Sequence, residues 1–123
     1  MEFLIDDSRP IFMQIAGRLE DEIINEILLE EAPVPSTNQL ASFYQINPAT
    51  AAKGVNVLVD QGILYKKRGV GMFVATGARA KLLEKRREQF FQQYVVTMIQ
   101  EARKLGIAIE ELVAMIEKGE RVS

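Results

Sequence analysis

The sequence contains no cysteine, no histidine and no tryptophan among its 123 residues. Without cysteine, disulfides, thiolate metal sites and cysteine nucleophiles are all excluded, and without histidine the commonest general base is missing too. Aspartate and glutamate remain, but carboxylates alone rarely form a tight transition-metal site. These absences disfavour an enzyme, so we expect no catalytic residues, no metal site and no cofactor.

Long apolar runs are also lacking. No stretch approaches the roughly 18 apolar residues that cross a bilayer, and the N-terminus lacks the basic start and apolar core of a signal peptide. With 48% hydrophobic and 26% charged residues, the composition is that of a globular protein. We therefore expect a cytoplasmic protein without a membrane partner.

The net charge of −2 is unevenly distributed along the chain. Residues 1–35 have two basic and nine acidic side chains, whereas residues 36–76 have four basic and one acidic. Residues 77–123 have nine basic and seven acidic side chains. The middle segment is thus a basic part of an acidic protein, which suits an anionic partner better than the overall charge does.

The first predicted helix follows Pro10, whose missing N–H is tolerated in a first helical turn. Apolar residues then recur every four positions, at Ile11, Ile15, Leu19, Ile23 and Ile27. This is one apolar helix face, and the acidic residues between 20 and 31 lie on the others. We interpret that acidic cluster as a solvated surface.

A second helix is predicted over residues 37–44. Pro35 precedes it, and Ser36 with Gln39 three residues later forms the pattern of a capping box. The helix should bury Leu40, Ala41 and either Phe43 or Tyr44. The next residues, Gln45 and Ile46, should form a turn.

A third helix is predicted to begin at Asn47 as its cap, with Pro48 at the first position. Its inward face should consist of Ala51, Val55, Leu58 and Val59. Gly54 is unfavourable within a helix, which suggests that a neighbouring helix approaches closely there. Gly62 should end this helix in a left-handed conformation.

A hairpin with a basic tip is predicted next. Leu64 and Lys66 lie in one flank, Met72 and Val74 lie in the other, and Gly69 and Gly71 supply the turn. Its tip contains Lys66, Lys67 and Arg68. A basic triplet alone is most often a solvated turn, but a ribbon tip behind a helix-turn-helix pattern favours nucleic-acid binding.

The C-terminal segment is predicted to form a long helix from about residue 78 to 105 and, after Gly106, a short second helix. Its apolar positions form a heptad-like seam. The residues expected in a dimer interface are Leu83, Phe90, Phe91, Tyr94, Val95, Met98, Ala102, Leu105, Leu112 and Ile116. Two helices cannot bury so much apolar surface alone, so we expect them to pack against a second copy. The alternative is that they fold back on their own domain.

These patterns together resemble the GntR family of bacterial transcription regulators, and its YtrA-like branch in particular. The matching boxes are Pro35-Ser36 with Leu40-Ala41, then Asn47-Pro48 with Thr50, then Gly69, Gly71, Phe73 and Val74. The resemblance implies a mainly α chain with a small β-wing (α+β): a winged helix-turn-helix followed by a two-helix dimerisation tail. It implies a DNA-binding domain at residues 1–76 and a dimerisation domain at 77–123.

The resemblance also implies a homodimeric regulator, with repression the expected effect, that binds a palindromic operator in double-stranded DNA. Regulators of this branch typically lie near genes for ABC transporters, and no effector can be named. The expected DNA contacts are Ser36, Thr37, Asn38, Gln39, Asn47, Ala49, Thr50, Lys53, Lys66, Lys67, Arg68 and Gly69. For the capping residues among them, a purely structural function is equally compatible with the sequence.

Four positions depart from the family pattern. Asn38 replaces an arginine that contacts DNA in many members, and Glu26 and Glu31 replace glycines of the loop after the first helix. Ala108 stands where a serine or threonine usually caps the last helix. With the acidic pI of about 5.3, Asn38 leaves one rival hypothesis: a winged-helix adaptor that binds proteins and has little DNA affinity.

Overall fold

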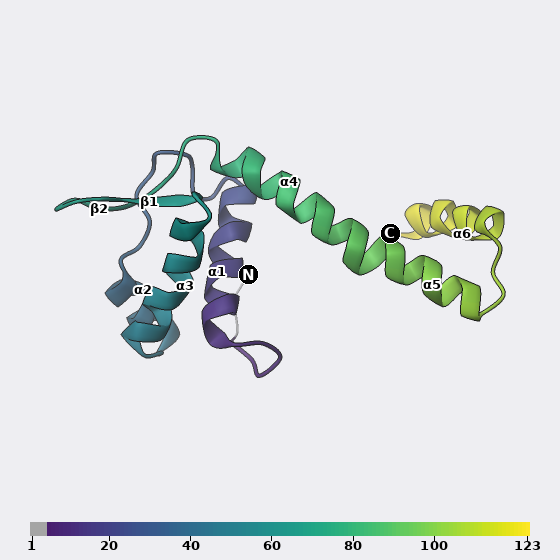
Figure 1. Ribbon diagram of the computed structural model, residues 1–123, viewed down its shortest axis with the longest axis horizontal. Coiled ribbons are helices and arrows are strands. Elements are labelled where there is room, and N and C mark those ends of the chain that lie inside the picture. Colours follow the sequence, from purple (N-terminus) through teal and green to yellow (C-terminus); the bar gives the residue numbers. More distant parts are fainter. Residues whose placement is uncertain (1–4) are drawn as a thin grey trace. The chain divides into compact units, whose positions relative to one another are not determined.

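The computed structural model describes residues 5–123, which are mainly helical with one two-stranded antiparallel sheet (Figure 1). In chain order the elements are α1 (Ile11–Ile24), α2 (Thr37–Tyr44), α3 (Pro48–Asp60), β1 (Leu64–Lys67), β2 (Gly71–Val74), α4 (Ala78–Phe90), the π-helix η1 (Phe91–Val96), α5 (Thr97–Lys104) and α6 (Ile109–Val122). This is the mainly α class with a small wing that the sequence predicted.

The chain divides into two compact units, Met1–Leu83 and Glu84–Ser123, here called the N-terminal unit and the C-terminal unit. The division falls inside α4, because Ala78 and Leu82 are buried in the core of the N-terminal unit. The functional boundary expected between residues 76 and 77 stays a prediction, since a packing boundary does not test it.

The N-terminal unit has a single apolar core. Helix α1 packs on α3, and α3 packs on α2, with the first turns of α4 completing the cluster (Figure 1). Its fully buried large side chains are Ile15, Ile23, Leu58, Ile63, Leu64, Val74 and Leu82. The four-residue period predicted for α1 and the inward face predicted for α3 supply several of them.

The close approach predicted at Gly54 is confirmed. A Cβ atom built there would lie 2.8 Å from the Phe12 carbonyl oxygen and 3.2 Å from the Ile15 Cβ. Any side chain at this position would therefore push α1 and α3 apart, which explains a glycine in the middle of a helix despite its conformational cost.

The predicted helix boundaries of α2 and α3 are confirmed by their caps. Ser36 Oγ accepts from the Gln39 N–H at 3.1 Å, and Gln39 Oε1 accepts from the Ser36 N–H at 2.8 Å. Asn47 Oδ1 accepts from the Ala49 N–H at 2.8 Å. Each bond satisfies a donor at a helix start that has no partner within the helix.

Helix α1 is shorter than predicted, and Ile27 is not part of its apolar face. The helix ends at Ile24, and Glu26 takes a left-handed φ of 60° that directs the chain away. The Ile27 N–H then donates to the Glu22 carbonyl, as in a Schellman motif, and the Ile27 side chain is 67% exposed. In α2, Tyr44 packs on the core and Phe43 is 76% exposed, which resolves the alternative left open there.

The wing forms the predicted hairpin, and its strands pair with Leu64 opposite Val74 and Lys66 opposite Met72. The sequence did not predict that residues 31–34 run along the other edge of β2. The Glu31 N–H donates to the Val74 carbonyl at 2.8 Å, and the Val34 N–H donates to the Met72 carbonyl at 2.9 Å. The base of the wing is therefore supported on both sides.

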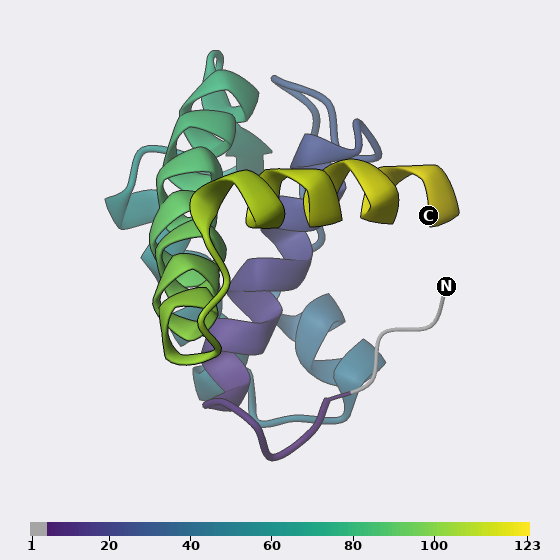
Figure 2. The ribbon, with the colours of Figure 1, turned by 90° about the vertical axis from the view of Figure 1, so that its right-hand side faces the viewer.

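The C-terminal unit begins within the predicted long helix, which stays helical to Lys104 but contains the π-helix η1. Nothing in the residue pattern indicated η1. Gly106 has the left-handed φ of 69° expected of a helix-ending glycine, and α6 leads away from α5 after it (Figure 2). Helix α6 has 14 residues, longer than the short helix predicted, and Ala108 provides no side-chain cap.

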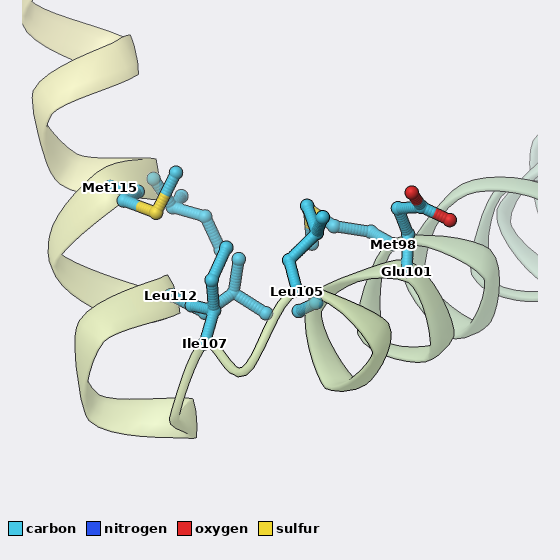
Figure 3. Close-up of a pocket in the computed structure, with 8 residues that line it drawn as sticks. Met98, Glu101, Leu105, Ile107, Leu112 and Met115 are labelled. Carbon is cyan, nitrogen blue, oxygen red and sulfur yellow. The ribbon is translucent and has the colours of Figure 1, made fainter.

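Helices α5 and α6 enclose an apolar groove of about 430 Å³ (Figure 3). Its walls are Met98, Ala102, Leu105, Ile107, Leu112, Met115 and Ile116, with Glu101 at the edge. Of the residues expected at the dimer interface, Ala102 and Leu112 are already buried within this unit. Phe90, Phe91, Tyr94, Met98, Leu105 and Ile116 are exposed, and Leu83 and Val95 are half-buried.

Candidate nucleic-acid interface

The start of α3 presents the polar face that the sequence predicted. Asn47, Ala49 and Lys53 are exposed and Thr50 is half-buried, because the opposite face, with Ala51, is in the core. Asn56, near Lys53 and one turn along the helix, is exposed and was not singled out from the sequence. A helix start with exposed polar side chains and the positive end of the helix dipole suits a phosphate or a base edge.

The start of α2 is also accessible. Ser36, Asn38 and Gln39 are exposed and Thr37 is half-buried. The side chains of Ser36 and Gln39 form the capping box, so any contact they make with DNA must be compatible with that bond. Asn38 adds hydrogen-bonding capacity here but no charge.

The wing separates its basic residues onto different faces. Side chains alternate along a strand, so Lys66 lies on the same face as the buried Leu64, whereas Lys67 lies on the opposite face with Tyr65. Arg68 and Gly69 form the exposed tip. Lys66 and Lys67 therefore point to opposite faces of the wing, so they would contact different phosphates.

The wing and the start of α3 lie at opposite ends of that helix, because β1 follows its C-terminal end (Figure 1). Thirteen helical residues separate them by about 20 Å along the axis. The predicted contact residues thus form two groups, one at the start of α2 and α3 and one on the wing, that would meet separate parts of a duplex.

Two of the predicted cations lie over aromatic rings. Lys53 Nζ is 4.2 Å from the centroid of the Phe12 ring, and Lys67 Nζ is 5.2 Å from that of Phe73. Both distances are within the range of a cation–π interaction. The Phe73 ring is stacked on Tyr65, its partner across the wing, with centroids 5.9 Å apart.

Glu31 fastens the loop before α2 to the wing. Its carboxylate accepts hydrogen bonds from the Tyr65 hydroxyl at 2.5 Å and from the Thr76 hydroxyl at 2.7 Å. The bond from Tyr65, followed by that from Thr76, lowers the pKa of Glu31, and the same bond raises the pKa of the Tyr65 hydroxyl. Like Glu26, Glu31 has a left-handed φ, of 65°, a conformation that glycine adopts at lower cost than glutamate.

The sequence predicted the basic side chains but not the residues that support them, which are Phe12, Glu31, Tyr65 and Phe73. One signal was available, since Tyr65 and Phe73 fall on the same face as Lys67 when the predicted strands alternate. No such signal exists for Phe12, because its place beside Lys53 depends on how α1 packs on α3.

Residues 5–123 contain no cluster of three or more acidic side chains placed to hold a metal ion. Within that same range no helix is long and apolar enough to span a membrane.

Comparisons with known proteins agree with this geometry. The family model of bacterial regulatory proteins of the gntR family matches residues 12–74. The transcriptional repressor YtrA of Bacillus subtilis is 28% identical over 105 residues, which cover 85% of this chain and 80% of YtrA.

Two solved structures extend the comparison. A GntR-family transcriptional regulator from Bacteroides thetaiotaomicron is similar with a TM-score of 0.77 and 33% identity, over 90% of this chain and 96% of that one. The DNA-binding domain of AraR in complex with operator ORX1 is similar with a TM-score of 0.56 and 28% identity, over 61% of this chain and 96% of that one.

The match at residues 12–74 spans every element from α1 to the end of the wing, and the similarity to the Bacteroides regulator continues into the C-terminal unit. The winged helix-turn-helix predicted from the residues is therefore confirmed. The chain belongs to the GntR family of bacterial DNA-binding transcriptional regulators.

Proposed function

We propose that this protein is a cytoplasmic homodimeric repressor that binds a two-fold symmetric operator. The observation that supports this most directly is the pairing of an accessible helix start at α3 with a basic wing at the other end of the same helix. The start of α3 enters the major groove, where Thr50 and Lys53 contact phosphate or base edges and Ala49 contacts a thymine methyl group. Lys66, Lys67 and Arg68 contact the backbone beside it.

Dimerisation follows from the C-terminal unit. Its exposed side chains include Phe90, Phe91, Tyr94, Met98, Leu105 and Ile116, together with the open groove between α5 and α6. An apolar surface of this kind is unfavourable in water, and a second copy of the same surface covers it in a two-fold arrangement. Two N-terminal units joined in this way would bind two half-sites, so the operator is palindromic.

Repression is the proposed effect because YtrA and the similar NagR of Bacillus subtilis are both named transcriptional repressors. Because the chain resembles the YtrA-like branch, we also propose ABC transporter genes among its targets. A homodimer on a palindrome that overlaps a promoter would exclude RNA polymerase.

The test is DNA binding to the promoter region upstream of the protein's own gene, measured by electrophoretic shift at several salt concentrations. Lys53→Ala and Arg68→Ala should each weaken binding, since each removes a cation that neutralises a phosphate. The plot of log affinity against log salt should flatten by about 0.9 for each phosphate that is no longer neutralised. Lys118→Ala, at an exposed position of the C-terminal unit, is the matched control and should bind like the wild type.

Two results would contradict the proposal. Equal affinity and equal salt slope in the wild type and both variants would show that these cations do not contact DNA. A wild-type protein that ignores both the promoter and excess non-specific duplex, yet retains other proteins, would instead support the adaptor hypothesis.

A further inference from the structure

We propose that the aromatic rings of Phe12 and Phe73 are positioning residues for DNA binding, each holding a lysine, Lys53 and Lys67 respectively, in place for a phosphate. The rings act through the lysines and need no DNA contact of their own. This inference rests on the proposed function, because it takes these lysines to be phosphate contacts.

The first ring depends on the packing of α1 against α3. Gly54 has no side chain, so the first turn of α1 can come very close to α3. The Phe12 carbonyl of that turn lies where it would clash with a Cβ atom at position 54. Lys53 is the neighbour of Gly54 in the chain, and its ammonium group therefore reaches the Phe12 ring, 4.2 Å from the centroid. Lys53 is nevertheless exposed, so a phosphate could reach its side chain.

The second ring depends on the register of the wing. Gly71 is opposite Lys67 and has no side chain, so Lys67 can lean diagonally across to Phe73, two residues along β2. The Phe73 ring is itself held by its stack on Tyr65, whose hydroxyl donates to Glu31. A series of contacts from the loop before α2 thus ends at a cation on the outer face of the wing.

Positioning matters because a free lysine side chain has many rotamers, and ordering it on a phosphate opposes binding. A ring restricts the ammonium group before DNA arrives, so less entropy is lost in the complex. Lys66 and Arg68 provide a contrast, since no ring of the described residues lies beneath either of them. The two supported cations come from different elements, which indicates that the arrangement does not arise from one local sequence motif.

The test is a double-mutant cycle for each pair, with binding to a labelled non-specific duplex at low ionic strength as the measurement. Phosphate contacts provide nearly all of such binding, so the operator need not be known. Phe12→Leu removes the ring and keeps an apolar side chain, and Phe12→Tyr keeps the ring. Phe73→Leu and Phe73→Tyr form the second set. Each Phe12 variant is also made together with Lys53→Ala, and each Phe73 variant together with Lys67→Ala.

We expect each leucine variant to weaken binding about two- to fivefold per protomer, which is the strength of an exposed cation–π contact. The loss should disappear when the paired lysine is already alanine, and the tyrosine variants should restore wild-type affinity. Phe43→Leu removes an exposed ring from α2 and should leave binding unchanged.

A loss that is the same with and without the paired lysine would overturn the inference, because it would show that the ring only stabilises the fold. No loss at either ring would overturn it as well. If Phe12→Leu does not fold, the Phe73 cycle decides alone. A wild-type protein that fails to bind any duplex would contradict both this inference and the proposed function, whereas binding with uncoupled cycles contradicts the inference only.

Discussion

The two units of this protein differ in how far their apolar side chains are buried. In the N-terminal unit, α1, α2, α3, the wing and the start of α4 surround one continuous core in which Ile15, Leu58 and Leu82 are fully buried. In the C-terminal unit only Ala102 and Leu112 are buried among the hydrophobic residues, while rings such as Phe91 and Tyr94 are exposed. The N-terminal unit has the continuous core of an independently folding domain, and the C-terminal unit has the exposed apolar surface that the proposed dimer would cover.

This contrast assigns different consequences to substitutions in each unit. In the N-terminal unit an apolar residue contributes to the stability of the monomer. In the proposed dimer, the same residue type in the C-terminal unit contributes to association, so its loss should change the oligomeric state and leave the core of the N-terminal unit intact.

The largest expected effect is therefore in the groove between α5 and α6. The double variant Leu105→Glu with Ile116→Glu places two charges on a surface that we expect to be buried in the dimer. Each large apolar side chain contributes about 1.5–3 kcal/mol when buried, so the dimer dissociation constant should rise by at least about 100-fold. Sedimentation equilibrium measures this directly.

The matched control is Gln100→Glu, which adds a charge at an exposed polar position of α5 outside the groove. It should remain dimeric. If the wild-type protein were monomeric at micromolar concentration, the apolar surface of the C-terminal unit would not serve association, and the proposed difference between the units would be wrong. The same conclusion would follow if the double variant unfolded the N-terminal unit without changing the mass.

The elements that could be predicted from sequence are those with a local cause. Ser36 and Asn47 cap helices through bonds to residues two or three positions away, and Gly62 ends α3 through its own backbone conformation. The outward face of α3 also follows from a simple period, which is why Ala49 and Lys53 could be named as candidate contacts.

The features that could not be predicted depend on segments distant in the chain. Residues 31–34 pair with β2 although about forty positions separate them, and Phe12 lies under Lys53 only because two helices meet at Gly54. Glu26 is a different case: glutamate rarely takes a left-handed conformation, so the residue pattern favoured a longer α1 than the one observed.

A medium effect is expected from glycine substitutions that test how tightly the N-terminal unit is packed. Gly54→Ala places a Cβ against the Phe12 carbonyl and should destabilise the protein by about 1–3 kcal/mol, although alanine favours helices. Gly17→Ala, in α1, meets no atom within 4 Å and should stabilise it by about 0.5–1 kcal/mol. Urea denaturation of both variants measures the change in the free energy of unfolding, which should have opposite signs in the two.

Gly119→Ala extends this comparison to the C-terminal unit, where the added Cβ also meets nothing within 4 Å. It should behave like Gly17→Ala if α6 is ordered. Stabilisation by Gly54→Ala would mean that α1 and α3 can separate at little cost, and that the N-terminal unit is not tightly packed at this contact.

The smallest expected effect is the pH dependence of the contact between Glu31 and the wing. Hydrogen bonds from Tyr65 and Thr76 lower the pKa of Glu31 from 4.5, so folding is favoured by the ionised carboxylate. The stabilisation is complete above that unfolded value and is lost as the pH falls through the lower folded pKa.

Glu31→Gln should therefore be less stable than the wild type at pH 7, and the difference should shrink below about pH 4.5. Thermal unfolding of both proteins between pH 7 and about pH 3 gives the difference in stability as a function of pH, in which the contributions of the other carboxylates cancel.

Glu30→Gln is the nearest control, because a carboxylate oxygen of Glu30 accepts from the Gly77 N–H and the amide oxygen of glutamine can do the same. A constant difference across the range would show that Glu31 supports the wing only through neutral hydrogen bonds, and that the ionised carboxylate does not strengthen this edge of the N-terminal unit.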